Sequence, residues 1–142
     1  MATTAPDPAL EVRHHNPEGV HRNPAFSQAV SVRSSHTVVY VGGQNAVTAA
    51  GAVIGRGDVA AQLHQVFENL VLVLDSAGAR LEHVVSWNVR LTVGQPLAAA
   101  FQVFRERWGN RSNPPAISLS FVAGLSHPDF LVELDAVAVV PG

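Results

Sequence analysis

Asn113-Pro114-Pro115-Ala116-Ile117-Ser118 and Val132-Glu133-Leu134-Asp135-Ala136-Val137-Ala138-Val139 are the segments that decide the fold of this chain. The first segment leads into a strand predicted from Ile117 to Val122, and the second, rich in β-branched and apolar residues, lies within a strand predicted from Phe130 to Val140. Glu133 and Asp135 stand two residues apart, so their side chains project from the same face of their strand. Carboxylates on an otherwise apolar strand need partners or a solvated cleft. Glu133 is therefore the first candidate for a functional residue.

Two helices are predicted upstream of these segments. Asp58 is a suitable N-cap for a helix that runs to about Ala77, with Gly78 just past its end. Pro96 suits the first turn of a second helix, which ends before Gly109. The apolar residues that fall on one face of the first helix are Val59, Leu63, Val66, Phe67, Leu70 and Leu74. The predicted buried stripe of the second helix is Leu97, Phe101, Phe104 and Trp108.

Strands are predicted at residues 27–32, 37–41, 84–91, 117–122 and 130–140. In the middle strand of the chain, Val85, Trp87, Val89 and Leu91 form the expected core face and alternate with Val84, Ser86, Asn88 and Arg90. The order β-β-α-β-α-β-β predicts an α+β fold, in which two helices pack on one face of a mixed sheet. Residues 1–16 are expected to form a flexible tail and residues 17–142 a single domain.

The composition limits the classes of function. The chain of 142 residues has a net charge of -2, and its basic residues are scattered, so nucleic acid is not an expected partner. Cysteine and lysine are absent, which excludes thiolate nucleophiles, cysteine-containing zinc sites and lysine Schiff bases. No apolar run approaches the roughly 20 residues that span a bilayer, and residues 1–12 do not resemble a signal peptide. A protein without a membrane partner, located in the cytoplasm, is expected.

Only 14% of the residues are charged, which favours a surface partly covered by sister subunits. The histidines do not have the spacing of a metal site, although His14, His15 and His21 are close in sequence. We therefore expect no metal.

Short motifs that run through the chain in a fixed order resemble the Rid family, the reactive intermediate deaminases of YjgF type. The likeness covers residues 17 to 140. The matching pieces are Asn23 to Val30, Val41-Gly42-Gly43-Gln44, Asp58 to Gln62, Ala77-Gly78, Pro114-Pro115-Ala116 and Val132 to Ala138. The resemblance implies a chorismate-mutase-like subunit, a homotrimer and a cleft between each pair of neighbours. In deaminating members an arginine holds the carboxylate of a small enamine or imine acid, a glutamate positions or activates water, and no cofactor is used.

Residue by residue, the resemblance assigns the catalytic role to Glu133 and a cleft-lining role to the backbone of Gly43. Phe26 stands where many members have tyrosine, and Phe101 where several have asparagine. Ile117 stands where the deaminases have their arginine. Isoleucine cannot form the charge-assisted pair that a guanidinium makes with a carboxylate.

Arg90 is a candidate for a displaced anion anchor, because it lies on the polar face of its strand. The alternative is a structural ion pair, with Glu133 or Asp135 as partner or across a subunit interface. Arg111 and Arg22 are weaker candidates for the anchor.

Three classes of function remain. The first is hydrolysis of a reactive enamine or imine to a carbonyl compound and ammonia, with altered substrate preference, in the intersubunit clefts. The second is another reaction in a biosynthetic pathway, and the third is binding of a small ligand for regulation. Some Rid relatives are described as endoribonucleases, a role that the charge balance does not favour.

Overall fold

The computed structural model describes residues 11–22, 24, 28–112 and 114–141. Its strands are β1 (Glu11–His15), β2 (Ala29–Arg33), β3 (Thr37–Gln44), β4 (Val84–Thr92), β5 (Ala116–Val122) and β6 (Val132–Val140). Its helices are α1 (Val59–Ser76) and α2 (Leu97–Trp108), with a short 3-10 turn, η1 (Leu81–His83), before β4.

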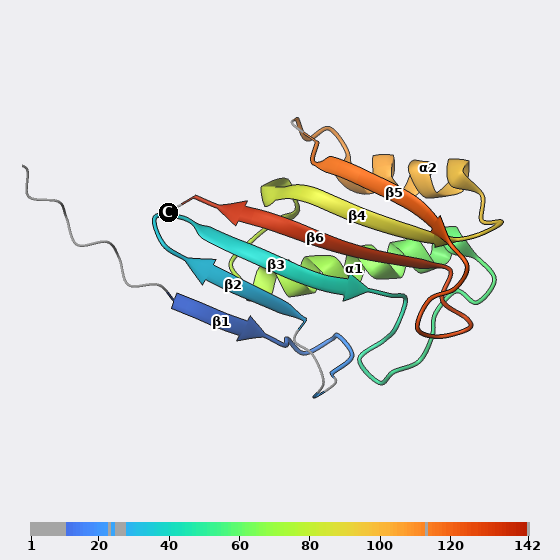
Figure 1. Cartoon of the computed structure of the whole chain (residues 1–142), viewed down its shortest axis with the longest axis horizontal. Coiled ribbons are helices and arrows are strands. Elements are labelled where there is room, and N and C mark those ends of the chain that lie inside the picture. The colour runs from blue at the N-terminus through green and yellow to red at the C-terminus, as the bar shows by residue number, and fades with distance from the viewer. Residues whose placement is uncertain (1–10, 23, 25–27, 113, 142) are drawn as a thin grey trace, which may run out of the picture.

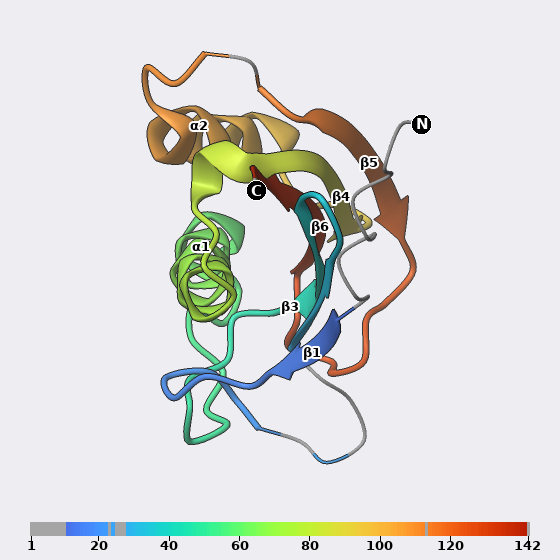
Figure 2. The ribbon, with the colours of Figure 1, turned by 90° about the vertical axis from the view of Figure 1, so that its left-hand side faces the viewer.

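The strands form one six-stranded sheet in the order β1-β2-β3-β6-β4-β5 (Figure 1). β5 runs parallel to β4, because α2 carries the chain back between them, and the other neighbours are antiparallel. Both helices pack on the same side of the sheet (Figure 2). The predicted α+β fold with two helices on one face of a mixed sheet is therefore confirmed.

The helix α1 forms as the sequence predicts. The Asp58 carboxylate accepts a hydrogen bond from the backbone N–H of Ala61 at 3.1 Å, and Gly78 follows the helix end with φ of +72°. The predicted apolar face is buried at every position, namely Val59, Leu63, Val66, Phe67, Leu70 and Leu74. This face contacts the sheet and supplies much of the hydrophobic core.

The strand β1 is an element that the sequence did not reveal. Its residues, Glu-Val-Arg-His-His, lie inside the expected flexible tail and show no apolar alternation, yet they pair antiparallel with β2. Backbone hydrogen bonding to an existing strand therefore produces this strand, without an alternating apolar pattern to mark it in the sequence. The remainder of the expected tail, residues 1–10, lies outside the described residues.

Two predicted core faces are wrong in part. Val85 is 48% exposed and Val84 is 2% exposed, because the pairing of β4 with β6 shifts register between Val84 and Ser86. Such an irregularity reverses the faces of the residues before it. In α2, Leu97 and Phe101 are 37% and 46% exposed, while Ala100 and Val103 take their places in the core.

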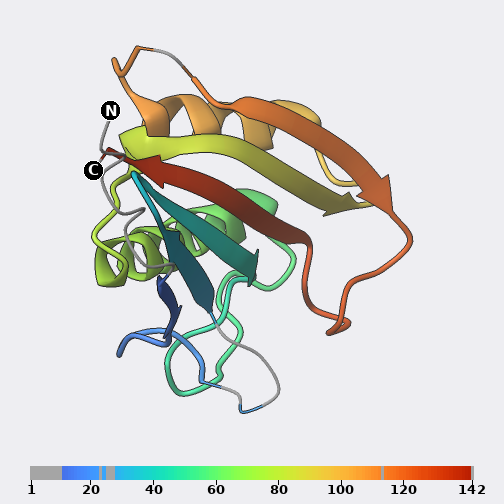
Figure 3. The same cartoon turned by 60° about the vertical axis from the view of Figure 1, so that its left-hand side comes forward.

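The sheet curves around the helices (Figure 3). Because both helices lie on the same side (Figure 2), they cover only one of its faces. Val39, Leu134 and Trp87 lie on the covered face and are buried. Tyr40, Arg90 and Glu133 alternate with buried residues of their strands, so they lie on the opposite face, which we call the open face. No helix in the described part of the chain is long and apolar enough to cross a membrane.

Candidate functional site

Gly43 and Glu133 meet where the pairing of β3 with β6 is irregular. Val41 pairs with Ala136 and Gln44 with Leu134, so β3 carries a bulge at Gly42 and Gly43. A Cβ atom added to Gly43 would lie 2.8 Å from both Cδ and Oε1 of Glu133. The absence of a side chain at Gly43 therefore leaves room for the Glu133 carboxylate, and the two predicted site residues are brought together.

Arg90 lies directly opposite Glu133 in the pairing of β4 with β6. Its Nη1 donates to Asp135 Oδ2 at 2.8 Å and to Glu133 Oε2 at 3.4 Å. The hydrogen bond to Asp135 raises the pKa of Arg90 above its ordinary value, so the guanidinium stays charged. Acidic groups of the same chain thus already compensate this cation, which favours the structural ion pair. A role for Arg90 in ligand binding stays a prediction.

The Glu133 carboxylate keeps one oxygen available. Its side chain is 24% exposed, and only Oε2 faces Arg90. Oε1 lies beside Gly43 and accepts no hydrogen bond from any described residue. A carboxylate oxygen in this position can accept a hydrogen bond from water, as general base catalysis requires.

Ile117 lies on the other side of the sheet. In the parallel pairing of β4 with β5 it stands beside Trp87, whose side chain faces the helices. Ile117 and Phe101 are each 46% exposed and line the same pocket, of about 360 Å³, between β5 and α2. We call it the aromatic pocket. Its lining residues are Trp87, Phe101, Phe104, Arg105, Trp108, Gly109, Pro114, Ile117 and Leu119.

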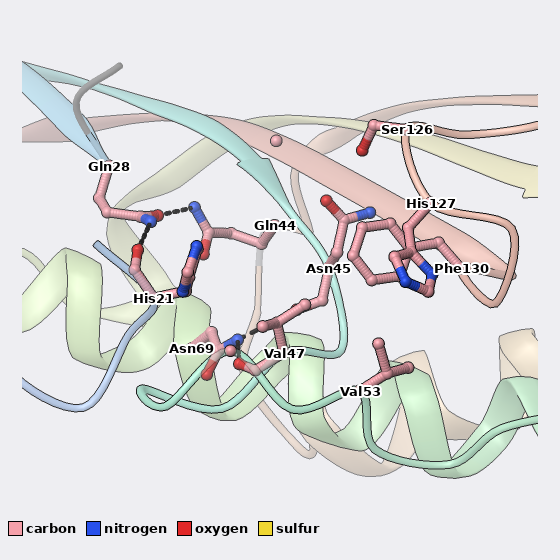
Figure 4. A pocket seen from close by; sticks show the side chains of 12 residues that line it. His21, Gln28, Gln44, Asn45, Val47, Val53, Asn69, Ser126, His127 and Phe130 are labelled. Atoms are coloured by element: carbon pink, nitrogen blue, oxygen red, sulfur yellow. Dashed lines mark hydrogen bonds between the residues drawn. The ribbon is translucent and has the colours of Figure 1, made fainter. Parts of the chain in front are cut away.

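A second pocket, of about 410 Å³, lies beside Gly43 and is shown in Figure 4. We call it the amide pocket. Gln44 Nε2 donates to Gln28 Oε1 at 2.8 Å, and Gln28 Nε2 donates to the backbone carbonyl of His21 at 2.6 Å. None of the residues found to line it is acidic or an arginine. They are His21, Gln28, Gly43, Gln44, Asn45, Val47, Gly51, Val53, Asn69, Ser126, His127 and Phe130.

Two buried amides of α1 hold the loops around the amide pocket. Asn69 Nδ2 donates to the carbonyls of Asn45 and Val47 at 3.0 and 2.9 Å. Gln62 Nε2 donates to the carbonyl of Asp129 at 2.8 Å, and Gln62 Oε1 accepts from the N–H of Leu131 at 2.9 Å. The lining loops are therefore anchored on the helix through their backbones.

Phe26 and Arg111 are two further residues that the sequence placed among the candidates. Phe26 lies outside the described residues, and its place in the site stays a prediction. Arg111 donates to the carbonyls of Arg107 and Trp108 and lies 3.5 Å from Glu82, so it has local partners outside the aromatic pocket. In the described part of the chain, no three His, Cys, Asp or Glu residues lie together in an arrangement that could hold a metal ion.

Several residues at these pockets were not assigned to a site from the sequence, among them His21, His127 and Arg105. The two histidines come from separate loops, and only the folded chain brings them to one pocket. Arg105 has a recognisable signal, because it stands four residues after Phe101 and so on the same face of α2.

Replacing Gly43 with alanine is expected to displace the Glu133 carboxylate with little loss of stability. The added Cβ meets the end of a flexible side chain, which can rotate away. We expect the free energy of unfolding to fall by about 1 kcal/mol or less, while any activity that depends on Glu133 falls more than tenfold, about the scale of a misplaced catalytic group. Denaturant unfolding and kinetic assays measure the two effects.

Gly124→Ala is the matched control for this substitution. A Cβ at Gly124 would meet nothing within 4 Å, so stability and activity are expected to stay close to the original protein. Equal activity in the Gly43 and Gly124 variants would contradict the close packing of Gly43 with Glu133.

The sequence of this chain is similar to a known protein family and to a protein of the RutC family. Residues 20–140 match the family model described as Endoribonuclease L-PSP. A RutC family protein from Pyrococcus abyssi is 32% identical over 113 residues, which cover 80% of this chain and 84% of the relative.

Solved structures show the same fold. The yeast protein YEO7 superposes with a TM-score of 0.80 at 24% identity, over 93% of this chain and 100% of the yeast chain. A Rid family protein of unknown function from Yersinia pestis, YyfA, superposes with a TM-score of 0.73 at 24% identity, over 93% of this chain and 100% of that protein.

Proposed function

The chain belongs to the Endoribonuclease L-PSP family, the YjgF or Rid family, and on this premise we propose that it hydrolyses a reactive imine or enamine to a carbonyl compound and ammonia. Family membership supports a small-molecule-binding role. The observation that carries the finer proposal is the Glu133 carboxylate, which has one oxygen free beside Gly43 on the open face.

The proposed site lies between subunits of a homotrimer. Within one subunit, Glu133 lies on the open face, whereas Ile117 and Phe101 line a pocket on the helix side of the sheet. One copy of the chain cannot present both groups to the same ligand. A neighbouring copy that docks on the open face would bring them together, and Tyr40, 52% exposed on this face, is apolar surface that such docking would cover.

The proposed reaction needs only water and one proton acceptor. Glu133 accepts a proton from water as the water oxygen bonds to the imine carbon, and it passes this proton to the nitrogen, which gives a carbinolamine. Glu133 then accepts the hydroxyl proton of the carbinolamine and passes it to the amine as the carbon–nitrogen bond breaks, so ammonia leaves and the carbonyl compound remains. A single carboxylate can perform both rounds of proton transfer.

Replacing Ile117 with arginine tests whether the site belongs to this reaction class. The new guanidinium is expected to pair with the carboxylate of small 2-imino acids and to raise their kcat/KM about tenfold or more, the range of a charge-assisted hydrogen bond. Imines generated in place from alanine or serine by an amino-acid oxidase, with release of keto acid and ammonia followed over time, provide the measurement.

Ile117→Leu is the matched control, since it keeps the pocket apolar and is expected to leave small imino acids poor substrates. The original protein should accelerate hydrolysis of at least one imine over buffer. If neither it nor a folded Ile117→Arg variant accelerates any imine, the proposed reaction is wrong.

A further inference from the structure

Arg105 brings an unpaired cation to the edge of the aromatic pocket. Its side chain is exposed and forms no ion pair or hydrogen bond with any residue in the described ranges. Arg107, two residues later in α2, differs: it donates to Glu68 at 2.6 Å and to His64 at 3.1 Å. The guanidinium of Arg105 is therefore free to bind an anion without first breaking an internal pair.

The interior of the aromatic pocket offers mainly apolar surface. Trp87 lies 5.5 Å from Phe104 and 5.6 Å from Trp108 between ring centroids, and the three rings are at least nine-tenths buried. Phe101 and Ile117 add half-exposed apolar surface. The volume of about 360 Å³ is within the range of small-molecule sites.

No acidic residue is present among the described residues that line this pocket. An anion at Arg105 would therefore meet no opposing charge from the lining. The combination of an apolar interior, a free cation at the edge and no carboxylate matches a ligand with an apolar body and one negative group.

We propose that the aromatic pocket binds a 2-oxo or 2-imino acid with a branched aliphatic or aromatic side chain, whose carboxylate pairs with Arg105 and whose side chain lies against Phe101 and Ile117. This inference rests on the proposed function, because it names the substrate class of the same site. It assigns to Arg105, on α2, the anchoring role that isoleucine at position 117 cannot fill.

An apolar ligand side chain would account for isoleucine at position 117, because Ile117 gives it an apolar contact. An arginine there would place a second cation beside the aromatic rings and remove apolar contact from a bulky side chain. Bulky 2-oxo acids should therefore bind better than pyruvate, and the Ile117→Arg variant should show the opposite preference.

Tryptophan fluorescence provides a direct binding assay, because the chain has only two tryptophans, Trp87 and Trp108, and both line this pocket. The probes are 4-methyl-2-oxopentanoate, the uncharged ketone 4-methyl-2-pentanone and pyruvate. The branched oxo acid is expected to change the emission at concentrations about tenfold or more below those needed for the ketone, the scale of one charge-assisted contact. Pyruvate should also bind more weakly, because it lacks the apolar body.

Arg105→Gln tests the anchor on the full-length protein. It is expected to weaken binding of the branched oxo acid about tenfold or more and to leave the ketone unchanged. Arg33→Gln removes the same charge from β2, at a distant part of the sheet, and should change neither affinity. Phe101→Ala should weaken the acid and the ketone together.

The inference is overturned if the branched oxo acid causes no change in emission, if pyruvate binds as tightly, or if Arg105→Gln binds it as the original protein does. The assay requires no turnover. Binding that depends on Arg105 in a protein that hydrolyses no imine would support this inference and contradict only the proposed reaction.

Discussion

Replacing Glu133 with glutamine is expected to lower the kcat of imine hydrolysis by about 10²–10⁴-fold, the usual contribution of a general acid or base. The amide has nearly the same shape, and its carbonyl oxygen can still accept a hydrogen bond from Arg90. It cannot accept a proton from water. Affinity for 4-methyl-2-oxopentanoate should therefore be nearly unchanged while turnover is lost, which separates catalysis from binding.

Asp135→Asn is the control for this substitution. Asp135 also bonds Arg90 and lies on the same face of β6, but the three atoms nearest to a Cβ added at Gly43 all belong to Glu133. Its replacement is expected to reduce kcat far less than the Glu133 substitution. Equal rates in the original protein and the Glu133→Gln variant, with both folded and assembled alike, would remove Glu133 from the mechanism.

Replacing Trp87 with alanine is expected to lower the free energy of unfolding by about 3–5 kcal/mol, as for other large aromatic residues in cores. Trp87 is 2% exposed, and its ring lies within 5.6 Å of the rings of Phe67, Phe104 and Trp108. Removal of this ring leaves a cavity where both helices meet the sheet. Denaturant unfolding at a fixed protein concentration measures the loss.

Trp87→Phe should cost much less than Trp87→Ala. The indole Nε1 is buried and has no hydrogen-bond partner among the described residues, and an unsatisfied buried donor costs about 1–3 kcal/mol. Phenylalanine removes this donor and keeps part of the ring contacts, so the two effects partly cancel. Val93→Ala, at a position 70% exposed, should stay within about 0.5 kcal/mol of the original protein. Equal losses for the alanine and phenylalanine variants of Trp87 would contradict this account.

The elements that the sequence predicted well carry their determinants locally. The helix α1 has a side-chain cap at Asp58, a glycine past its end and an apolar face at helical spacing. In contrast, β1 has no such pattern and exists because it pairs with β2. Pairing between distant segments cannot be inferred from the five residues of β1 themselves.

Errors in the predicted core have a related physical origin. The alternation in residues 84–91 suggested that Val85 is buried, but a shift in the pairing with β6 exposes it. Phe101 fits the apolar stripe of α2, but periodicity cannot distinguish core packing from the edge of a pocket. Both outcomes depend on the neighbouring element.

The candidate site could be predicted only in part. The resemblance brought Gly43 and Glu133 forward as residues of one cleft, and the bulge in β3 places them in contact. The direction of Ile117 depends on its pairing with Trp87, which no local pattern reveals. Arg105 is free because no acidic side chain of the described residues pairs with it, and only the folded chain shows this.

The hydrogen bonds of Gln62 and Asn69 affect how the ligand preference of the amide pocket can change by substitution. They hold the loops by backbone carbonyls and N–H groups, whereas side chains such as Val53 and Ser126 line the pocket and make none of these hydrogen bonds. Exchange of Val53 or Ser126 therefore leaves the hydrogen bonds that shape the loops intact. Part of the pocket surface can change without altering the loops, and a new ligand preference can arise by substitution there alone.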